Sequence, residues 1–107
     1  MLEVSAKEAF ELMSRGEAYG VDVREQFEWD AGHAEGVNFN PLSAFNIDEL
    51  PTDKPVIVIC RSGNRSGQVC EALAEVRSDL KNMIGGMKAW AAEGLPMVSD
   101  SGAPTVA

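Results

Sequence analysis

The segment PVIVICRSGNRSGQVC, residues 55–70, constrains the fold more than any other part of the chain. It opens with the consecutive β-branched residues Val56 to Ile59, and such an unbroken apolar run predicts a strand that is buried on both faces, as in a parallel sheet. A polar loop follows, and apolar residues then recur at helical spacing, which predicts a helix over residues 66–77. A buried strand that leads through a short loop into a helix is typical of an α/β domain.

The rest of the chain repeats this alternation of strands and helices. A capping box of Ser5 and Glu8 predicts the start of a first helix, and one or two helical turns should end at Gly32. A last helix should end at Gly94, because Pro96 follows it closely. We therefore expect an α/β domain with a mostly parallel, five-stranded sheet flanked by helices. Besides the strand before Cys60, the expected strands are 2–4, 19–23, 37–39 and 81–86.

The length and composition fit one domain with a short tail. The chain has 107 residues, of which 45% are hydrophobic and 24% are charged, as is ordinary for a globular domain. We assign residues 1–98 to the domain. Residues 99–107 are small and polar, and we expect them to form a loose C-terminal tail.

The charge and the cysteine content exclude several classes of function. A formal net charge of −8 argues against general binding of nucleic acid or of anionic membranes, since both need a basic surface. The two cysteines do not form a disulfide-rich secreted scaffold. The start of the chain lacks the apolar region of a signal peptide, and no apolar run reaches membrane-spanning length. We expect a cytoplasmic protein.

The position of Cys60 points to chemistry rather than to packing. Ligands of open α/β sheets bind outside the carboxyl ends of the strands, and Cys60 follows such an end. The free amides at the start of the next helix favour an anion, as does a concave loop of successive amides. Gly63 and Asn64 tolerate the left-handed backbone that a tight loop needs. We therefore expect a Cys60 thiolate, with its pKa lowered from about 8.5 to below 7.5.

Three further residues of this segment have separate expected roles. Cys70 falls on the apolar stripe of the expected helix, so we interpret it as a small buried hydrophobe. Arg65 closes the loop and is expected to brace the loop backbone and to face the anion at the thiol. Arg61 follows the thiol directly and is expected to reach outward.

Residues outside the loop carry weaker signals. His33 lies between glycines and more often holds a turn in such a place than takes part in catalysis. Asp22 and Arg24, at the end of a strand, fit a structural ion pair and a pocket wall equally well. Trp29 and Trp90 are expected to be core anchors.

Three stretches, taken together, resemble a known family. Cys60-Arg61-Ser62-Gly63-Asn64-Arg65 resembles the active-site loop of single-domain rhodaneses, the thiosulfate sulfurtransferases. DVREQFEWDAGHAEGV resembles the family's Asp-x-Arg, Glu-aromatic and Gly-His segments, and GGMKAWAAEGLP resembles its closing segment. The chain departs from the family pattern at Asn38-Phe39-Asn40-Pro41, where the asparagine is displaced and a polar residue precedes the proline.

The resemblance implies a single rhodanese-like domain and a reaction in two steps. Cys60 would take the outer sulfur of thiosulfate or another sulfane donor, and the resulting persulfide would pass it to cyanide or a thiol. The expected partners are a small anionic donor and a thiol or protein acceptor, with no metal or organic cofactor, and the protein is expected to be a monomer. The implied substrate-binding residues are Arg61, Ser62, Gly63, Asn64, Arg65 and Ser66, with Asp22, Arg24 and His33 as supporting residues.

Two other classes of function compete with sulfur transfer. Rhodanese-like phosphatases carry one more residue in the loop, which widens it for phosphate or arsenate. The loop here has six residues from Cys60 to Arg65, which favours sulfur transfer. Rhodanese-like modules that only bind or regulate often lack the cysteine, whereas this chain keeps it.

Overall fold

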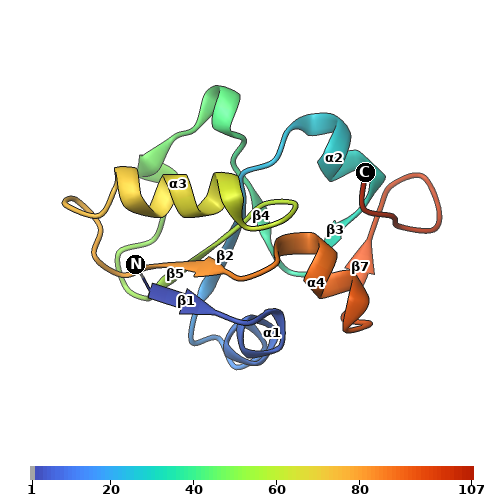
Figure 1. Ribbon diagram of the computed structural model, residues 1–107, viewed down its shortest axis with the longest axis horizontal. Helices are drawn as coiled ribbons and strands as arrows, with labels where there is room; N and C mark the ends of the chain where they lie inside the picture. Colours follow the sequence, from blue (N-terminus) through green and yellow to red (C-terminus); the bar gives the residue numbers. More distant parts are fainter. Residues whose placement is uncertain (1) are drawn as a thin grey trace.

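A parallel sheet of five strands, in the order β1-β6-β5-β2-β4, forms the centre of the molecule. The computed structural model describes residues 2–107 (Figure 1). The strands and helices agree with the expected α/β class and with the expected number of strands in the sheet. In chain order, the elements are β1 (Leu2–Val4), α1 (Ala6–Ser14), β2 (Tyr19–Asp22), α2 (Gln26–Ala31), β3 (His33–Ala34), β4 (Asn38–Phe39), η1 (Leu42–Ala44), η2 (Ile47–Glu49), β5 (Val56–Ile59), α3 (Asn64–Ala72), β6 (Leu80–Met83), α4 (Gly86–Ala92) and β7 (Met97–Val98).

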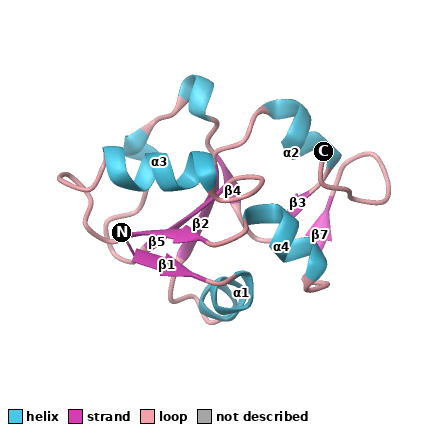
Figure 2. Cartoon of the chain, viewed as in Figure 1, coloured by secondary structure: helices cyan, strands magenta, loops and turns pink. Residues whose placement is uncertain are grey.

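The central strand β5 is buried on both faces, as its unbroken apolar run predicted. Side chains of a strand alternate between the two faces of a sheet. Ile57 and Ile59 accordingly join a core that includes Trp90 of α4, while Val56 and Val58 join a second core that includes Val69 of α3. Figure 2 shows α3 on one side of the sheet and α1 and α4 on the other. Each face of the sheet therefore has its own layer of helices.

The edge strand β4 keeps its place although the sequence departs there from the family pattern. It pairs in parallel with β2, with Asn38 opposite Val21. The buried side chain of Asn40 donates to the carbonyl oxygen of Asn46 at 2.8 Å and accepts from the amide of Asn46 at 2.9 Å. The polar residue before Pro41 is thus fully paired, and the chain continues along the sheet edge.

The helix expected over residues 66–77 begins earlier and ends earlier. It starts at Asn64, because Gly63 adopts a left-handed backbone (φ 100°) and forms the N-cap. It ends at Ala72. Val76, which the helical spacing placed on the apolar face, is exposed. Val76 is 67% exposed, so it contributes little apolar burial that would favour a longer helix.

The last parallel strand is also displaced from the expected residues 81–86. β6 covers Leu80–Met83, and Gly85 and Gly86 both have positive φ, which ends the strand and starts α4. The small antiparallel pair of β3 and β7 was not expected. Two-residue strands leave no periodicity in a sequence.

The C-terminal tail is not loose. The amide of Thr105 donates to the carbonyl oxygen of Ala31 at 2.9 Å, and Val106 packs against the core that contains Trp90. A Cβ atom on Gly32 would lie only 2.7 Å from the nitrogen of Thr105. The missing side chain of Gly32 therefore makes room for the tail, and this contact is invisible in the composition of the tail itself.

Candidate active site

Cys60 lies at the carboxyl end of β5, where the chain enters a short loop before α3. The first turn of α4 holds the loop in place. The amide of Met87 donates to the carbonyl oxygen of Cys60 at 2.8 Å, and the amide of Lys88 donates to that of Arg61 at 3.0 Å. Gly86 permits this approach: a Cβ atom there would lie 2.6 Å from the carbonyl oxygen of Arg61. The glycine pair before α4 thus fixes the backbone of the nucleophile.

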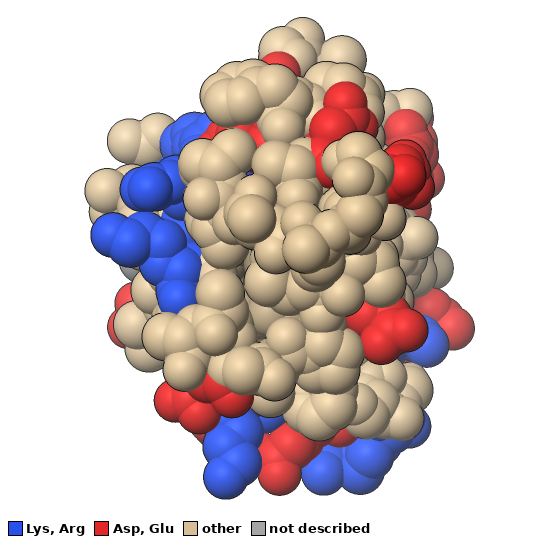
Figure 3. All heavy atoms as spheres, turned by 90° about the vertical axis from the view of Figure 1, so that its right-hand side faces the viewer, with Lys and Arg blue, Asp and Glu red and all other residues tan. Residues whose placement is uncertain are grey.

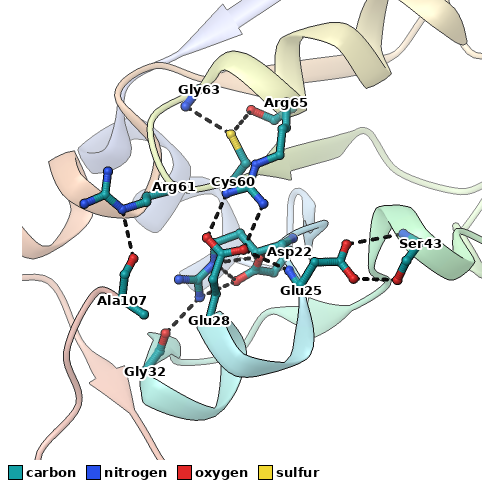
Figure 4. Close-up of polar contacts among 12 residues, drawn as sticks. Asp22, Glu25, Glu28, Gly32, Ser43, Cys60, Arg61, Gly63, Arg65 and Ala107 are labelled. Atoms are coloured by element: carbon teal, nitrogen blue, oxygen red, sulfur yellow. Dashed lines mark hydrogen bonds and ion pairs between the residues drawn. The ribbon is translucent and has the colours of Figure 1, made fainter.

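The sulfur of Cys60 accepts two hydrogen bonds from its own loop and helix. The amide of Gly63 lies 3.1 Å from Sγ (Figure 4). The hydroxyl of Ser66 lies 3.2 Å from Sγ. Cys60 itself is buried, while Arg61, Ser62 and Asn64 are exposed above it. The thiol therefore lies beneath the exposed surface of the loop, surrounded by donors. Asn64 has helical rather than left-handed backbone, so only Gly63 supplies the turn.

These donors make Cys60 more acidic than an ordinary thiol. Burial by itself would raise the pKa of Cys60, but the hydroxyl of Ser66 and the amides of Ser66, Gly63 and Ser62 outweigh it, so the net effect is a lowered pKa. The lowered pKa of Cys60 agrees with the expectation, and its causes are individual hydrogen bonds. Hydrogen bonds lower the pKa of this thiol, and no arginine among residues 2–107 is in hydrogen-bond contact with the sulfur.

Asn82 of β6 supports both of these donors and was missed by sequence reasoning. Its Nδ2 donates to the carbonyl oxygen of Gly63 at 3.1 Å, and its Oδ1 accepts from the hydroxyl of Ser66 at 2.5 Å. Asn82 and Ser66 are both buried. A single asparagine in a strand gives no sequence signal of such a role, because the role depends on β6 lying beside β5.

Arg65 forms an ion pair with a carboxylate instead of contacting the loop backbone. Its two terminal nitrogens each donate to one oxygen of Glu28 on α2, both at 2.8 Å. The side chain of Glu28 is only 5% exposed and that of Arg65 is 35% exposed. This fork lowers the pKa of Glu28 in spite of its burial. The prediction that Arg65 braces the loop backbone is therefore wrong: its side chain joins α3 to α2. Glu28 is a site residue that the family segment contained without a stated role.

Arg61 reaches outward, as expected. Its Nε donates to the carbonyl oxygen of Ala107 in the tail at 2.8 Å. In Figure 4 its side chain points away from the sulfur of Cys60. Its terminal nitrogens take part in no hydrogen bond within residues 2–107, so they are available to bind an anion from solvent.

Asp22 and Arg24 form a structural ion pair beneath the site. Both side chains are fully buried, and Nη2 of Arg24 lies 2.8 Å from Oδ2 of Asp22. The same nitrogen donates to the carbonyl oxygen of Gly32 at 2.8 Å. Complete burial favours the structural ion pair over the pocket wall for these two side chains. They form a second charged layer, and Arg24 helps to lower the pKa of Glu28.

His33 holds a turn. Within the described residues, no hydrogen bond connects its side chain to the Cys60 site. Its Nδ1 lies 2.9 Å from the carbonyl oxygen of Trp29, and the two rings are stacked at 3.5 Å. Trp29 is only partly buried, so it is not the core anchor that was expected. Trp90 is the core anchor that was expected, because it is fully buried. Its Nε1 donates to the carbonyl oxygen of Pro96.

Cys70 is a buried free thiol on α3, as predicted. Burial raises its pKa to about 11. Within residues 2–107, no three His, Cys, Asp or Glu side chains come together to hold a metal ion. The same part of the chain contains no helix that is long and apolar enough to cross a membrane.

The comparisons with known proteins agree with this site. The family model "Rhodanese-like domain" matches residues 5–93. A protein named "Sulfurtransferase" from Allochromatium vinosum is 40% identical over 85 residues, which cover 77% of this chain and 79% of that protein. This chain is therefore a member of the rhodanese family.

Other relatives are longer than this chain. "Probable adenylyltransferase/sulfurtransferase MoeZ" from Mycobacterium tuberculosis is 38% identical over 84 residues, 71% of this chain but only 21% of MoeZ. The chain matches 49% and 58% of two uncharacterised proteins from Synechocystis and Bacillus subtilis. The chain thus spans a fifth to just over half of these relatives.

Solved structures show the same fold. A rhodanese-related protein from Thermoplasma volcanium superposes with a TM-score of 0.79 at 30% identity, over 92% of this chain and 98% of that one. The rhodanese-like domain of an Anabaena protein reaches a TM-score of 0.82 at 20% identity and covers 100% of this chain and 87% of that one. The second likeness supports the fold alone.

Proposed function

We propose that this protein is a sulfurtransferase that carries sulfane sulfur on Cys60. The observation that carries the proposal is the Cys60 sulfur, which accepts hydrogen bonds from Gly63 and Ser66 at the end of a central strand. Such a site stabilises a sulfur anion without a histidine base. Membership of the rhodanese family and the relatives named as sulfurtransferases support sulfur transfer in general.

We propose thiosulfate, or another sulfane donor, as the first substrate. The Cys60 thiolate attacks the outer sulfur of thiosulfate, a new S–S bond forms, and sulfite leaves with the electron pair of the old one. In the second step, cyanide or a thiol attacks the outer sulfur of the persulfide and the Cys60 thiolate leaves. The loop amides hold the sulfur anion, while the free nitrogens of Arg61 attract the anionic donor.

The mass of the intact protein tests this proposal directly. After incubation with thiosulfate, we expect wild-type protein to gain the mass of one sulfur atom and to lose it again on addition of cyanide. The Cys70→Ala variant should behave like the wild type, because Cys70 is buried away from the loop on α3. The Cys60→Ala variant should gain no sulfur. A sulfur adduct on Cys60→Ala would contradict the proposed nucleophile.

Phosphatase activity is the alternative reaction, and the six-residue loop argues against it. We propose negligible turnover of an aryl phosphate by the wild-type protein. Comparable turnover of an aryl phosphate and of thiosulfate would show that loop length does not separate the two reactions in this chain.

We also propose that the protein acts as a cytoplasmic monomer that delivers sulfur to a thiol acceptor. The net charge of −8 supports a freely diffusing protein rather than one bound to nucleic acid. Figure 3 shows basic side chains at the upper left edge and along the bottom of the face that it presents, and acidic ones at the right edge and the bottom. Size-exclusion chromatography and cell fractionation would test the oligomeric state and the location.

A further inference from the structure

Three buried side chains share one hydroxyl proton beside the nucleophile. The Ser66 oxygen lies 3.2 Å from Sγ of Cys60 and 2.5 Å from Oδ1 of Asn82. A hydroxyl has one proton, so Ser66 can donate to only one of these acceptors at a time. The amide of Asn82 is oriented by its Nδ2, which donates to the carbonyl oxygen of Gly63, so its oxygen must face Ser66.

We propose that Asn82 is a positioning residue that acts on Cys60 through the Ser66 hydroxyl and so sets how readily the thiol ionises. While the sulfur of Cys60 is uncharged, the hydroxyl donates to Asn82, which is the closer and stronger acceptor. When Cys60 becomes a thiolate, the hydroxyl rotates and donates to Sγ instead. The proton stays on the Ser66 oxygen throughout, so only the direction of one hydrogen bond changes.

Asn82 therefore stabilises every state in which Sγ is uncharged. The thiol is one such state. If the proposed function is right, the persulfide is another, because its negative charge lies on the outer sulfur. A buried hydroxyl without an acceptor would cost free energy in both states, and Asn82 prevents that. The asparagine thus gives the Ser66 hydroxyl an acceptor whenever Sγ carries no charge.

A single substitution of Asn82 cannot isolate this effect. Asn82 also holds the carbonyl oxygen of Gly63, whose amide donates to Sγ. Loss of that support would weaken the amide donor and raise the pKa of Cys60, while loss of the competing acceptor would lower it. The two effects separate only when the substitution is made both with and without the Ser66 hydroxyl.

The test is a double-mutant cycle read by the acidity of Cys60. The four proteins are Cys70→Ala, which leaves one thiol, and the same protein with Ser66→Ala, with Asn82→Ala, or with both. The pKa of Cys60 is taken from the pH dependence of its alkylation by iodoacetamide. The nearest charged groups, Arg65, Glu28, Asp22 and Arg61, are the same in all four proteins and so cancel.

We expect Ser66→Ala to raise the pKa of Cys60, because the thiolate loses a donor. Asn82→Ala also shifts this pKa. We expect that shift to be more negative, or less positive, in the protein that keeps Ser66 than in the protein that carries Ser66→Ala. The difference between the two backgrounds should be about one pKa unit, the size of one hydrogen bond to a charged group. An equal shift in both backgrounds, or a larger rise with Ser66 present, would overturn the proposal.

Folding and function can be separated from this result. If Asn82→Ala does not fold by circular dichroism, Asn82→Leu fills nearly the same volume without an acceptor and takes its place in the cycle. Alkylation needs no sulfur transfer, so the cycle can succeed or fail whatever the reaction is. Absence of a sulfur adduct on wild-type protein would contradict the proposed function and leave the role of Asn82 standing.

Discussion

At the scale of single residues, hydrogen bonds from Ser66, Gly63 and Ser62 are the main causes of the lowered pKa of the nucleophile. The two terminal nitrogens of Arg65 are engaged by Glu28. The donors that remain for Cys60 are uncharged. Such donors keep their effect at high salt, because short hydrogen bonds in a buried site are not screened as exposed charges are.

The two thiols should therefore differ sharply in reactivity although both are buried. Cys60 is 1% exposed and Cys70 is 4% exposed, so burial cannot separate them. The pKa of Cys60 is lowered, and that of Cys70 is raised to about 11. At neutral pH, we expect iodoacetamide to label Cys60 alone. Peptide mapping by mass spectrometry checks this, with Cys60→Ala as the unlabelled control. Preferential labelling of Cys70 would contradict the assigned acidities.

The two arginines of the loop should respond differently to replacement by lysine. Arg65→Lys should lose most activity, because one ammonium group cannot make the two parallel bonds to Glu28. Arg61→Lys should keep most activity, since an exposed steering residue acts mainly as a point charge. Arg61→Ala should raise the thiosulfate KM more than it lowers kcat.

Salt separates the two roles in the same kinetic assay. The deficit of Arg61→Ala relative to wild type should shrink as salt rises, because the screening length falls to about 8 Å near physiological ionic strength. The deficit of Arg65→Lys should not change. Equal damage from both lysine variants would place both arginines in the structural wall of the site.

At the scale of elements, the Glu28–Arg65 fork ties α2 to α3 across the site. Glu28→Gln keeps the shape of the side chain and removes its charge. We expect a loss of about 1 kcal/mol in unfolding free energy at neutral pH, a modest value because Arg65 is one-third exposed. Glu17→Gln, in an exposed pair with Arg15, is the matched control and should change little.

The acid side of this prediction follows from the lowered pKa of Glu28. The stabilisation is complete above the ordinary carboxyl pKa of about 4.3 and is lost as the pH falls through the lowered value. The difference between wild type and Glu28→Gln in urea unfolding should therefore be largest at neutral pH and shrink in acid. A difference that is independent of pH would mean that shape, not charge, carries the effect.

The same elements show how far the sequence alone could go. The strand before Cys60 was predictable because its four apolar residues are contiguous, and the loop was predictable because its residues carry their chemistry locally. The partners of Ser66 and Arg65 were not, because Asn82 and Glu28 are distant along the chain and meet them only after the sheet has formed. The helix ends were displaced because Gly63 caps α3 before the apolar periodicity begins.

At the scale of the whole molecule, the tail closes over the end of α2 and reaches the site. Gly32→Ala should drive a methyl group into the backbone of Thr105, because the new Cβ atom would lie 2.7 Å from the Thr105 nitrogen. We expect a lower melting temperature for this variant. Deletion of residues 103–107 should remove most of the difference between Gly32→Ala and its glycine parent. A full difference in the deleted background would mean that the added methyl group destabilises the protein through a contact other than the tail.

The contact between Arg61 and the carbonyl oxygen of Ala107 also bears on how the protein is prepared for assay. Figure 1 shows the start of β1 and the C-terminal end of the chain on opposite sides of the molecule. A purification tag joined after Ala107 would emerge beside Arg61 and compete with an anionic donor for its guanidinium, most of all if the tag were acidic. A tag joined before Leu2 would start at the edge strand β1 instead. Kinetic constants measured with tags at the two ends should differ, and cleavage of the C-terminal tag should bring them together.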